Sequence, residues 1–294
     1  MIKSEKSSVM KSEKTPGQGR NASQFFVVGM NVFLFVFALT AIFPLVWMLY
    51  NAFKTSPEFA QNIFALPKTL YWQNFADIFK SSRIFVSLFN SLFNSVLATV
   101  GIIFFSFVIA YFLARYRFPG RNFLYAFFLF GLLVPIHGLL VPIFIQFKEL
   151  GMLDTRWTLL PPYIAFGLSG TIFLIESYIR SLPTEIEEAA FMDGATTIDL
   201  LAKVIFPMCR PIIATTAILS FLSTLNEFAF ALILLNDDIY KTMPLWLNSF
   251  KGERTVDYTG LMAALTVALV PVIAVYLIFR EKIIQGFVAG AVRG

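Results

Sequence analysis

The sequence predicts an all-α membrane protein of about six transmembrane helices, and its composition leads to this fold class. Hydrophobic residues make up 57% of the 294 residues, and charged residues only 14%. Soluble proteins carry about 25% charged residues, so the deficit indicates a chain that lies in a lipid bilayer. The apolar residues also gather into stretches of about 20 residues, the length that crosses the hydrocarbon core.

Composition also excludes several classes of function. Cys209 is the one cysteine and His137 the one histidine, so the sequence holds no internal disulfide and no His/Cys zinc site. The net charge is +5, yet no dense run of Lys and Arg alternates with aromatic residues. We therefore expect no nucleic-acid partner and attribute the basic excess to membrane topology.

The predicted domains follow the apolar stretches. Residues 1–23 are rich in Ser, Lys and Glu, so we expect a disordered polar tail. The next stretch is too long for the core of a signal peptide and lacks a convincing cleavage site, which favours a retained span. The membrane domain is expected at 24–280 and a C-terminal tail at 281–294. Its spans are expected at 24–51, 87–113, 122–146, 158–179, 211–235 and 257–279.

Prolines interrupt these spans, and each removes a backbone donor and frees a carbonyl that lipid cannot satisfy. Kinked spans are common in transporters but also occur in other membrane proteins, so the prolines are weak support for transport. They are Pro44, Pro135, Pro142, Pro161, Pro162 and Pro271.

The orientation rests on a short basic link between the second and third spans. Arg115, Arg117 and Arg121 crowd into this link, and the positive-inside rule places such a link in the cytoplasm. With that choice both termini and the 180–210 loop are cytoplasmic as well. The excess of Lys and Arg in the cytoplasmic segments as a whole is modest, so the arginine triplet decides the orientation.

The loop between the fourth and fifth spans, within residues 181–211, predicts two short helices with a break between them. Thr184 with Glu187, and Thr196 with Asp199, each fit a capping box. Gly194 fits a left-handed stop between the helices. The second helix then has an apolar stripe at helical spacing, and Pro207 ends it. The stripe consists of Ile198, Leu201, Ala202 and Ile205.

Such a loop could simply lie on the membrane surface, but its residues favour another interpretation. Glu188-Ala189-Ala190, followed by Asp193-Gly194 and later Pro207, resembles the EAA motif of bacterial ABC importer permeases. Small alanines let a partner backbone approach closely, and the carboxylate of Glu188 suits an arginine fork. The resemblance implies that the loop is a cytoplasmic coupling helix seated in an ATPase subunit.

The resemblance to the carbohydrate-uptake branch, with MalG-like permeases, extends over about 24–294. Leu225-Asn-Glu-Phe228 and Thr242-Met-Pro-Leu-Trp-Leu247 are similar to stretches of that branch. The glycine-rich end, with Gly286, Gly290 and Gly294, is similar to a tail that contacts the ATPase. The implied fold is that of a type I ABC importer permease in the bacterial inner membrane.

The resemblance also implies the assembly. A Gly-x-x-x-x-Gly-Lys-[Ser/Thr] loop is absent from the sequence, so ATP and Mg²⁺ are expected on separate ATPase subunits, with no cofactor bound by this chain. The expected partners are a second, MalF-like permease, two ABC ATPase subunits, an extracellular solute-binding protein, the sugar substrate and the lipid bilayer.

Polar residues inside the spans are candidates for the substrate path, since a carboxylate at membrane depth is costly and usually functional. Asn226 and Glu227 could hydrogen-bond sugar hydroxyls, and His137 is a weaker candidate. The alternative for Glu227 is a partner on another helix, and for His137 a satisfied interior position. Glu176 is expected to pair with Arg180 one helical turn on, and Cys209 to serve packing.

Three other functions are alternatives to a sugar permease. A permease for amino acids, polyamines or anions would carry a similar loop. A membrane-embedded enzyme would need convergent acid, base or metal groups, for which the sequence has too few residues, so no catalytic residue is expected. A receptor would have no need of the EAA helix.

Overall fold

The computed structural model describes residues 18–252 and 256–291, and these form helices joined by short links. Within these residues the one β-type pairing is an isolated bridge between Lys251 and Val256. The first helices are α1 (Gln18–Asn51), α2 (Ser56–Gln61), α3 (Gln73–Lys80), α4 (Arg83–Arg115), α5 (Arg121–Phe130), α6 (Ile136–Glu149) and α7 (Leu160–Arg180). They are followed by α8 (Glu185–Met192), α9 (Thr197–Asp199), α10 (Phe206–Met208), α11 (Arg210–Leu225), α12 (Ala229–Leu234), α13 (Met243–Leu247) and α14 (Tyr258–Ala291).

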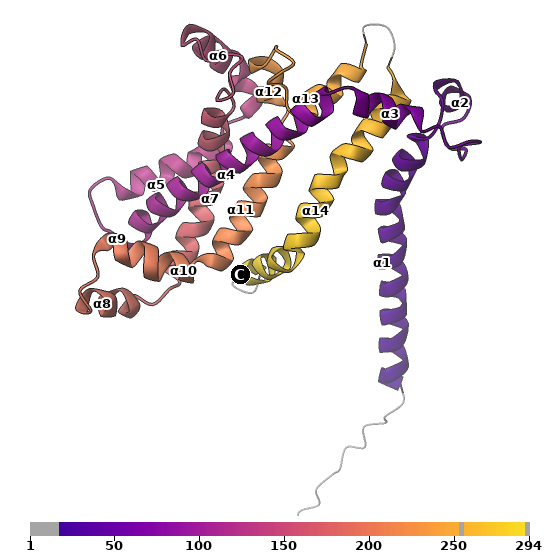
Figure 1. The fold of residues 1–294 in the computed structure, drawn as a ribbon. Helices are drawn as coiled ribbons and strands as arrows, with labels where there is room; N and C mark the ends of the chain where they lie inside the picture. Colours follow the sequence, from indigo (N-terminus) through magenta and orange to yellow (C-terminus); the bar gives the residue numbers. More distant parts are fainter. Residues whose placement is uncertain (1–17, 253–255, 292–294) are drawn as a thin grey trace, which may run out of the picture.

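Four helices, α1, α4, α7 and α14, are long and apolar enough to cross a membrane. Two bent helix pairs raise the number of candidate spans in the described residues to as many as six. Helices α4, α7 and α11 pack together as the centre of the bundle (Figure 1). We call the end with α8 and α9 the α8 end, and the end with α6, α12 and α13 the α12 end (Figure 1).

The third predicted span is not one continuous helix, which corrects the expectation for 122–146. Helix α5 passes into a 3₁₀ turn at Gly131–Leu133, and α6 then leaves at 101° to it. Pro135 explains the break, because it lacks a backbone donor and forces the preceding Val134 into an extended conformation. Pro142, in contrast, lies inside α6.

The fifth predicted span, 211–235, is also interrupted. Helix α11 ends at Leu225, and α12 begins at Ala229 after a short non-helical link. At its other end α11 meets the preceding segment, Thr197–Met208, at 78°. The break falls at Cys209, which is fully buried and serves packing as expected.

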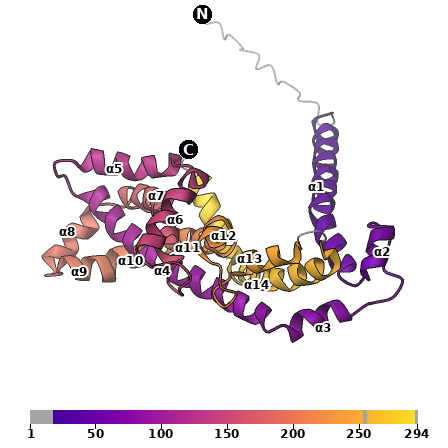
Figure 2. The same cartoon turned by 90° about the horizontal axis from the view of Figure 1, so that it is seen from above.

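The two terminal helices extend beyond their predicted limits. Helix α1 begins at Gln18, within the predicted polar tail, and stands apart from the bundle with α14 as its main neighbour (Figures 1 and 2). Helix α14 continues to Ala291, through most of the predicted C-terminal tail. The predicted disorder of 1–17 lies outside the described residues.

Close contact of α4 with α7 forms the rigid centre. A side-chain carbon added at Gly101 would lie 2.7 Å from Ile164 of α7, and one added at Gly167 would lie 2.3 Å from Ile102 of α4. Each isoleucine therefore fills the space that the opposite glycine leaves open. Apolar clusters lie at both ends of this crossing, and the one at the α8 end joins α4 and α7 to Leu200, Ile205 and Cys209.

Candidate functional site

The loop between α7 and α11 folds as two short helices with a glycine turn, as predicted. Gly194 has a φ of +83°, and the backbone N–H of Ala195 donates to the carbonyl of Ala190, which closes α8 in the manner of a Schellman motif. Thr196 and Asp199 form the predicted capping box at α9. The other predicted box is wrong, because Thr184 has helical backbone angles and its side chain makes no capping bond.

The predicted apolar stripe on the second helix is confirmed only in part. Residues Leu200–Ile205 form a π-helix, whose wider turns shift the positions that face the bundle. Leu200 and Ile205 are buried, whereas Ile198 is 79% exposed. The α-helical spacing therefore selects Leu201 and Ile205 correctly, since both pack on the core. It also selects the exposed Ile198 and Ala202, and it misses the buried Leu200.

The tip of the loop is an exposed surface with both apolar and charged groups. Met192 is 87% and Phe191 46% exposed, and these two neighbouring side chains form an apolar tip that water does not favour. Glu188, Ala189, Asp193 and Gly194 are exposed beside it, and Ala190 is half-buried. Pro207 lies away from the tip, on α10. Such a protruding mixed surface suits a protein partner.

Glu187, not the exposed Glu188, joins the loop to the bundle. Its carboxylate accepts hydrogen bonds from the Tyr111 hydroxyl at 3.0 Å and from Nε of Arg115 at 2.5 Å. Arg115 also donates to the carbonyl of Leu182 at 2.8 Å. The side chains of Arg115 and Glu187 are each 10% exposed, so this is a buried ion pair between α4 and α8.

A second group of charges joins α5 and α7 at the same end. Glu176 pairs with Arg180, as predicted from their spacing, and with Arg121 at 3.8 Å. Arg121 also donates to the carbonyl of Leu113 at 2.7 Å. Arg115 and Arg121, selected from the sequence for topology, thus also have specific partners.

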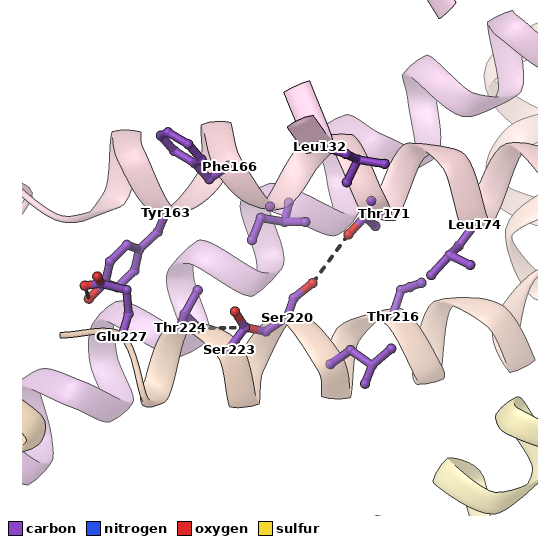
Figure 3. A pocket seen from close by; sticks show the side chains of 14 residues that line it. Leu132, Tyr163, Phe166, Thr171, Leu174, Thr216, Ser220, Ser223, Thr224 and Glu227 are labelled. Atoms are coloured by element: carbon purple, nitrogen blue, oxygen red, sulfur yellow. Dashed lines mark hydrogen bonds between the residues drawn. The ribbon is translucent and has the colours of Figure 1, made fainter. Parts of the chain in front are cut away.

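A groove of ≈ 290 Å³ runs between α7 and α11, with α4 behind it (Figure 3). Hydroxyl side chains lie along it, and apolar side chains form its remaining walls. The lining residues are Ile102, Leu132, Tyr163, Phe166, Gly167, Gly170, Thr171, Leu174, Thr216, Leu219, Ser220, Ser223, Thr224 and Glu227.

Sequence reasoning missed these hydroxyls, although a signal was present. Thr216, Ser220, Ser223 and Thr224 recur at helical spacing, which places them on one face of α11. Thr171 of α7 faces this row, and its hydroxyl lies 3.5 Å from that of Ser220 (Figure 3). A row of hydroxyls along a groove between spans can exchange hydrogen bonds with a polyhydroxylated molecule.

Glu227 lies at the α12 end of the groove, where its carboxylate is held by the chain itself. Oε2 accepts from the Tyr163 hydroxyl at 3.0 Å, and Oε1 accepts from the backbone N–H of Phe230 at 2.8 Å. The carboxylate thus caps the first turn of α12 and ties it to α7. It is the one charged group among the described residues that line the groove.

The other residues predicted for the substrate path are not gathered here. Asn226 is exposed beyond the groove, and its amide donates to the carbonyl of Leu222. His137 is exposed on α6, away from the groove lining. Gly286 and Gly290 fall on the last turns of α14, and Gly294 lies outside the described residues.

Outside the spans, Asp154 clamps two loops of the α12 end together. Its carboxylate accepts from the backbone N–H groups of Asn236 and Asp237, at 2.5 and 2.9 Å. Partial burial raises the pKa of Asp154, but these hydrogen bonds outweigh burial and leave the pKa below its ordinary value. A hydrogen bond from Lys241 likewise lowers the pKa of the Asp238 carboxyl.

Sequence comparisons agree with this geometry. Residues 102–287 match the family described as "Binding-protein-dependent transport system inner membrane component". A probable ABC transporter permease, YurM of Bacillus subtilis, is 34% identical over 90% of this chain and 87% of its own length. The diacetylchitobiose uptake permease NgcG of Streptomyces coelicolor is 33% identical over 91% of this chain and 89% of its own.

A solved structure has the same fold. It is a chain of a bacterial ABC transporter that imports the acidic polysaccharide alginate, with a TM-score of 0.78 and 25% identity. The match covers 88% of this chain and 97% of that one. The relatives are permease subunits and not enzymes. With its bent helix pairs and exposed EAA loop, this chain therefore belongs to the inner membrane permeases of binding-protein-dependent ABC transporters.

Proposed function

We propose that this chain is the permease subunit of an ABC importer and carries a sugar or oligosaccharide through the groove between α7 and α11. The hydroxyl row of the groove is the observation that carries this proposal. Thr216 and Thr224 donate to carbonyls of their own helix and can still accept, whereas the Ser223 hydroxyl can both donate and accept. The row can therefore replace part of the water that a sugar loses. Phe166 and the aliphatic walls offer apolar surface for the carbon faces of the ring. The diacetylchitobiose relative supports a saccharide.

In the proposed assembly, the α8 end is cytoplasmic and the exposed EAA loop seats in an ATPase subunit. The apolar tip at Phe191 and Met192 and the Glu188 carboxylate provide the contact. Two such ATPases bind ATP and Mg²⁺, and a MalF-like permease supplies the other wall of the path. A solute-binding protein delivers the sugar at the α12 end. ATP binding closes the ATPase pair and shifts the spans between inward-facing and outward-facing states.

The transport half of this proposal is tested in proteoliposomes with the complete importer and its binding protein. Ser223→Leu places bulk in the groove from an exposed position, so we expect sugar uptake to fall while the assembled complex is retained. Thr40→Leu on the outlying helix α1 is the control and should transport normally. Uptake of amino acids, polyamines or anions instead of sugars would contradict the proposal.

The ATPase contact is tested with a pair of glycines in the same backbone conformation. Gly194 and Gly120 have φ of +83° and +84°, and open space surrounds both. Alanine therefore imposes similar backbone strain at either position. We expect Gly194→Ala and Glu188→Ala to insert normally and to uncouple ATP hydrolysis from uptake, whereas Gly120→Ala stays coupled. Normal transport by both loop variants would rule out this contact.

A further inference from the structure

Helix α8 has two routes by which its movement can reach the groove. The covalent route passes the turn at Gly194, the π-helix of Leu200–Ile205 and the 78° bend before α11. Each of these breaks can absorb displacement. The other route is the direct contact from Glu187 to the end of α4, where Tyr111 and Arg115 both donate to one carboxylate.

The direct contact is built for a fixed geometry. Charge-assisted hydrogen bonds are directional and stronger than neutral ones, and here they are shielded from water. Arg115 uses a second nitrogen for the carbonyl of Leu182, which holds its guanidinium in place. Tyr111 is 1% exposed, so the aromatic ring is fixed by packing as well. Movement of α8 without α4 would have to break a buried ion pair.

Helix α4 extends from this contact to the far end of the molecule. Its 33 residues form one unbroken helix, about 50 Å long at 1.5 Å per residue. Near its middle Ile102 lines the groove and packs against Gly167 of α7. Near its other end the amide of Asn90 donates to the carbonyls of Ile239 and Lys241, in the link before α13.

We propose that the Glu187–Arg115 pair is the mechanical joint of the importer, through which α8 displaces α4 and so opens and closes the groove. Both are positioning residues, since neither lies at the groove or on the exposed loop tip. This inference rests on the proposed function. It also assigns a separate role to each of two adjacent carboxylates, with Glu188 facing the ATPase and Glu187 facing α4.

The test compares Glu187→Gln with Glu185→Gln in the reconstituted importer. Gln keeps an oxygen for Tyr111 but loses the charge that holds Arg115, whereas Glu185 is exposed on the same helix. For Glu187→Gln we expect ATPase subunits to co-purify, while stimulation of ATP hydrolysis by the loaded binding protein falls about tenfold. Sugar carried per ATP should fall with it, and Glu185→Gln should match the unmodified complex.

A covalent cross-link between positions 115 and 187 tests whether this contact transmits movement or only stabilises the fold. In a Cys209→Ser background, Arg115→Cys with Glu187→Cys should be uncoupled, and a short bismaleimide that links the two thiols should restore coupling. If Glu187→Gln and the double-cysteine protein do not accumulate, Tyr111→Phe is a milder variant. It loses one hydrogen bond and should lower the stimulation of ATP hydrolysis by the loaded binding protein about threefold.

The outcomes distinguish this inference from the function on which it rests. Normal coupling in Glu187→Gln or in Tyr111→Phe overturns the joint, as does a cross-linked protein that stays uncoupled. Loss of ATPase co-purification in Glu187→Gln overturns it too, since the pair would then merely shape the docking loop. If the unmodified chain binds no ATPase, it is the proposed function that fails.

Discussion

The two ends of the bundle are held by different kinds of polar contact. At the α8 end, charged side chains of separate helices pair with one another, as Arg115 does with Glu187 and Arg121 with Glu176. At the α12 end, the ion pair of Arg83 with Asp238 is exposed, and less exposed side chains bind backbone groups. Asp154 and Glu227 accept from N–H groups, and Asn90 donates to carbonyls. The first arrangement joins rigid helices to each other. The second holds short helices and irregular links against them.

This contrast predicts that charge removal is most damaging at the α8 end. Arg115→Ala leaves the buried Glu187 carboxylate without its cation, which should lower the free energy of unfolding by about 3–5 kcal/mol. Denaturant titration of the detergent-solubilised chain measures the change. A loss below about 1 kcal/mol would mean that water reaches the pair and that the contrast between the ends is wrong.

At the α12 end, the largest effect is expected at Glu227. Glu227→Ala removes the acceptor for Tyr163 and for the first turn of α12, at a cost of about 1–3 kcal/mol in the free energy of unfolding. Glu227→Gln keeps an oxygen and should lose less. Hydrogen exchange of the α12 amides should be faster in Glu227→Ala. Unchanged exchange would contradict the role of Glu227 as the cap of α12.

A smaller effect that depends on pH is expected at Asp154. Asn tolerates the positive φ of 51° at this position, so Asp154→Asn removes the charge alone, at about 1 kcal/mol near pH 7. Because folding lowers the pKa of Asp154 from its ordinary value of 3.8, the carboxylate stabilises the fold at pH values above 3.8. That contribution is lost as the pH falls through the lowered value. The free energies of unfolding of the unmodified chain and of Asp154→Asn should therefore converge as the pH is lowered. A difference that stays constant with pH would refute the charge effect.

The smallest effect is expected for the exposed pair of Arg83 with Asp238, whose side chains are 62% and 43% exposed. Arg83→Ala should change the free energy of unfolding by about 0.5 kcal/mol or less, because water screens the pair and Lys241 also holds Asp238. Titration in about 1 M salt should remove even that difference. A loss comparable to that of Arg115→Ala would abolish the distinction between exposed and buried pairs.

The positions at which helices break were partly predictable from the sequence. Pro135 correctly marked a weak point of the third span, and Gly194 the turn after α8, since each constrains its own backbone. The 101° size of the first bend was not predictable, because it depends on what α5 and α6 pack against. The failed capping box at Thr184 shows that a matching residue pair does not ensure the backbone angles of a cap.

The two carboxylates on α8 show the same limit. Glu187 and Glu188 are chemically identical, and a motif selects Glu188 by its place before the alanines. What separates them is Arg115, which lies 72 residues away along the chain. Helical geometry turns adjacent residues about 100° apart, so only one of the two can face α4.

The sequence by itself determined the membrane-spanning class, the helical loop with its glycine turn, and the family, because hydropathy, backbone preference and motif are properties of short segments. Tertiary structure alone decided which carboxylate is buried, which hydroxyls share a groove and where the long helices bend. These depend on contacts between residues distant in the chain, and such contacts exist only after the helices pack against one another.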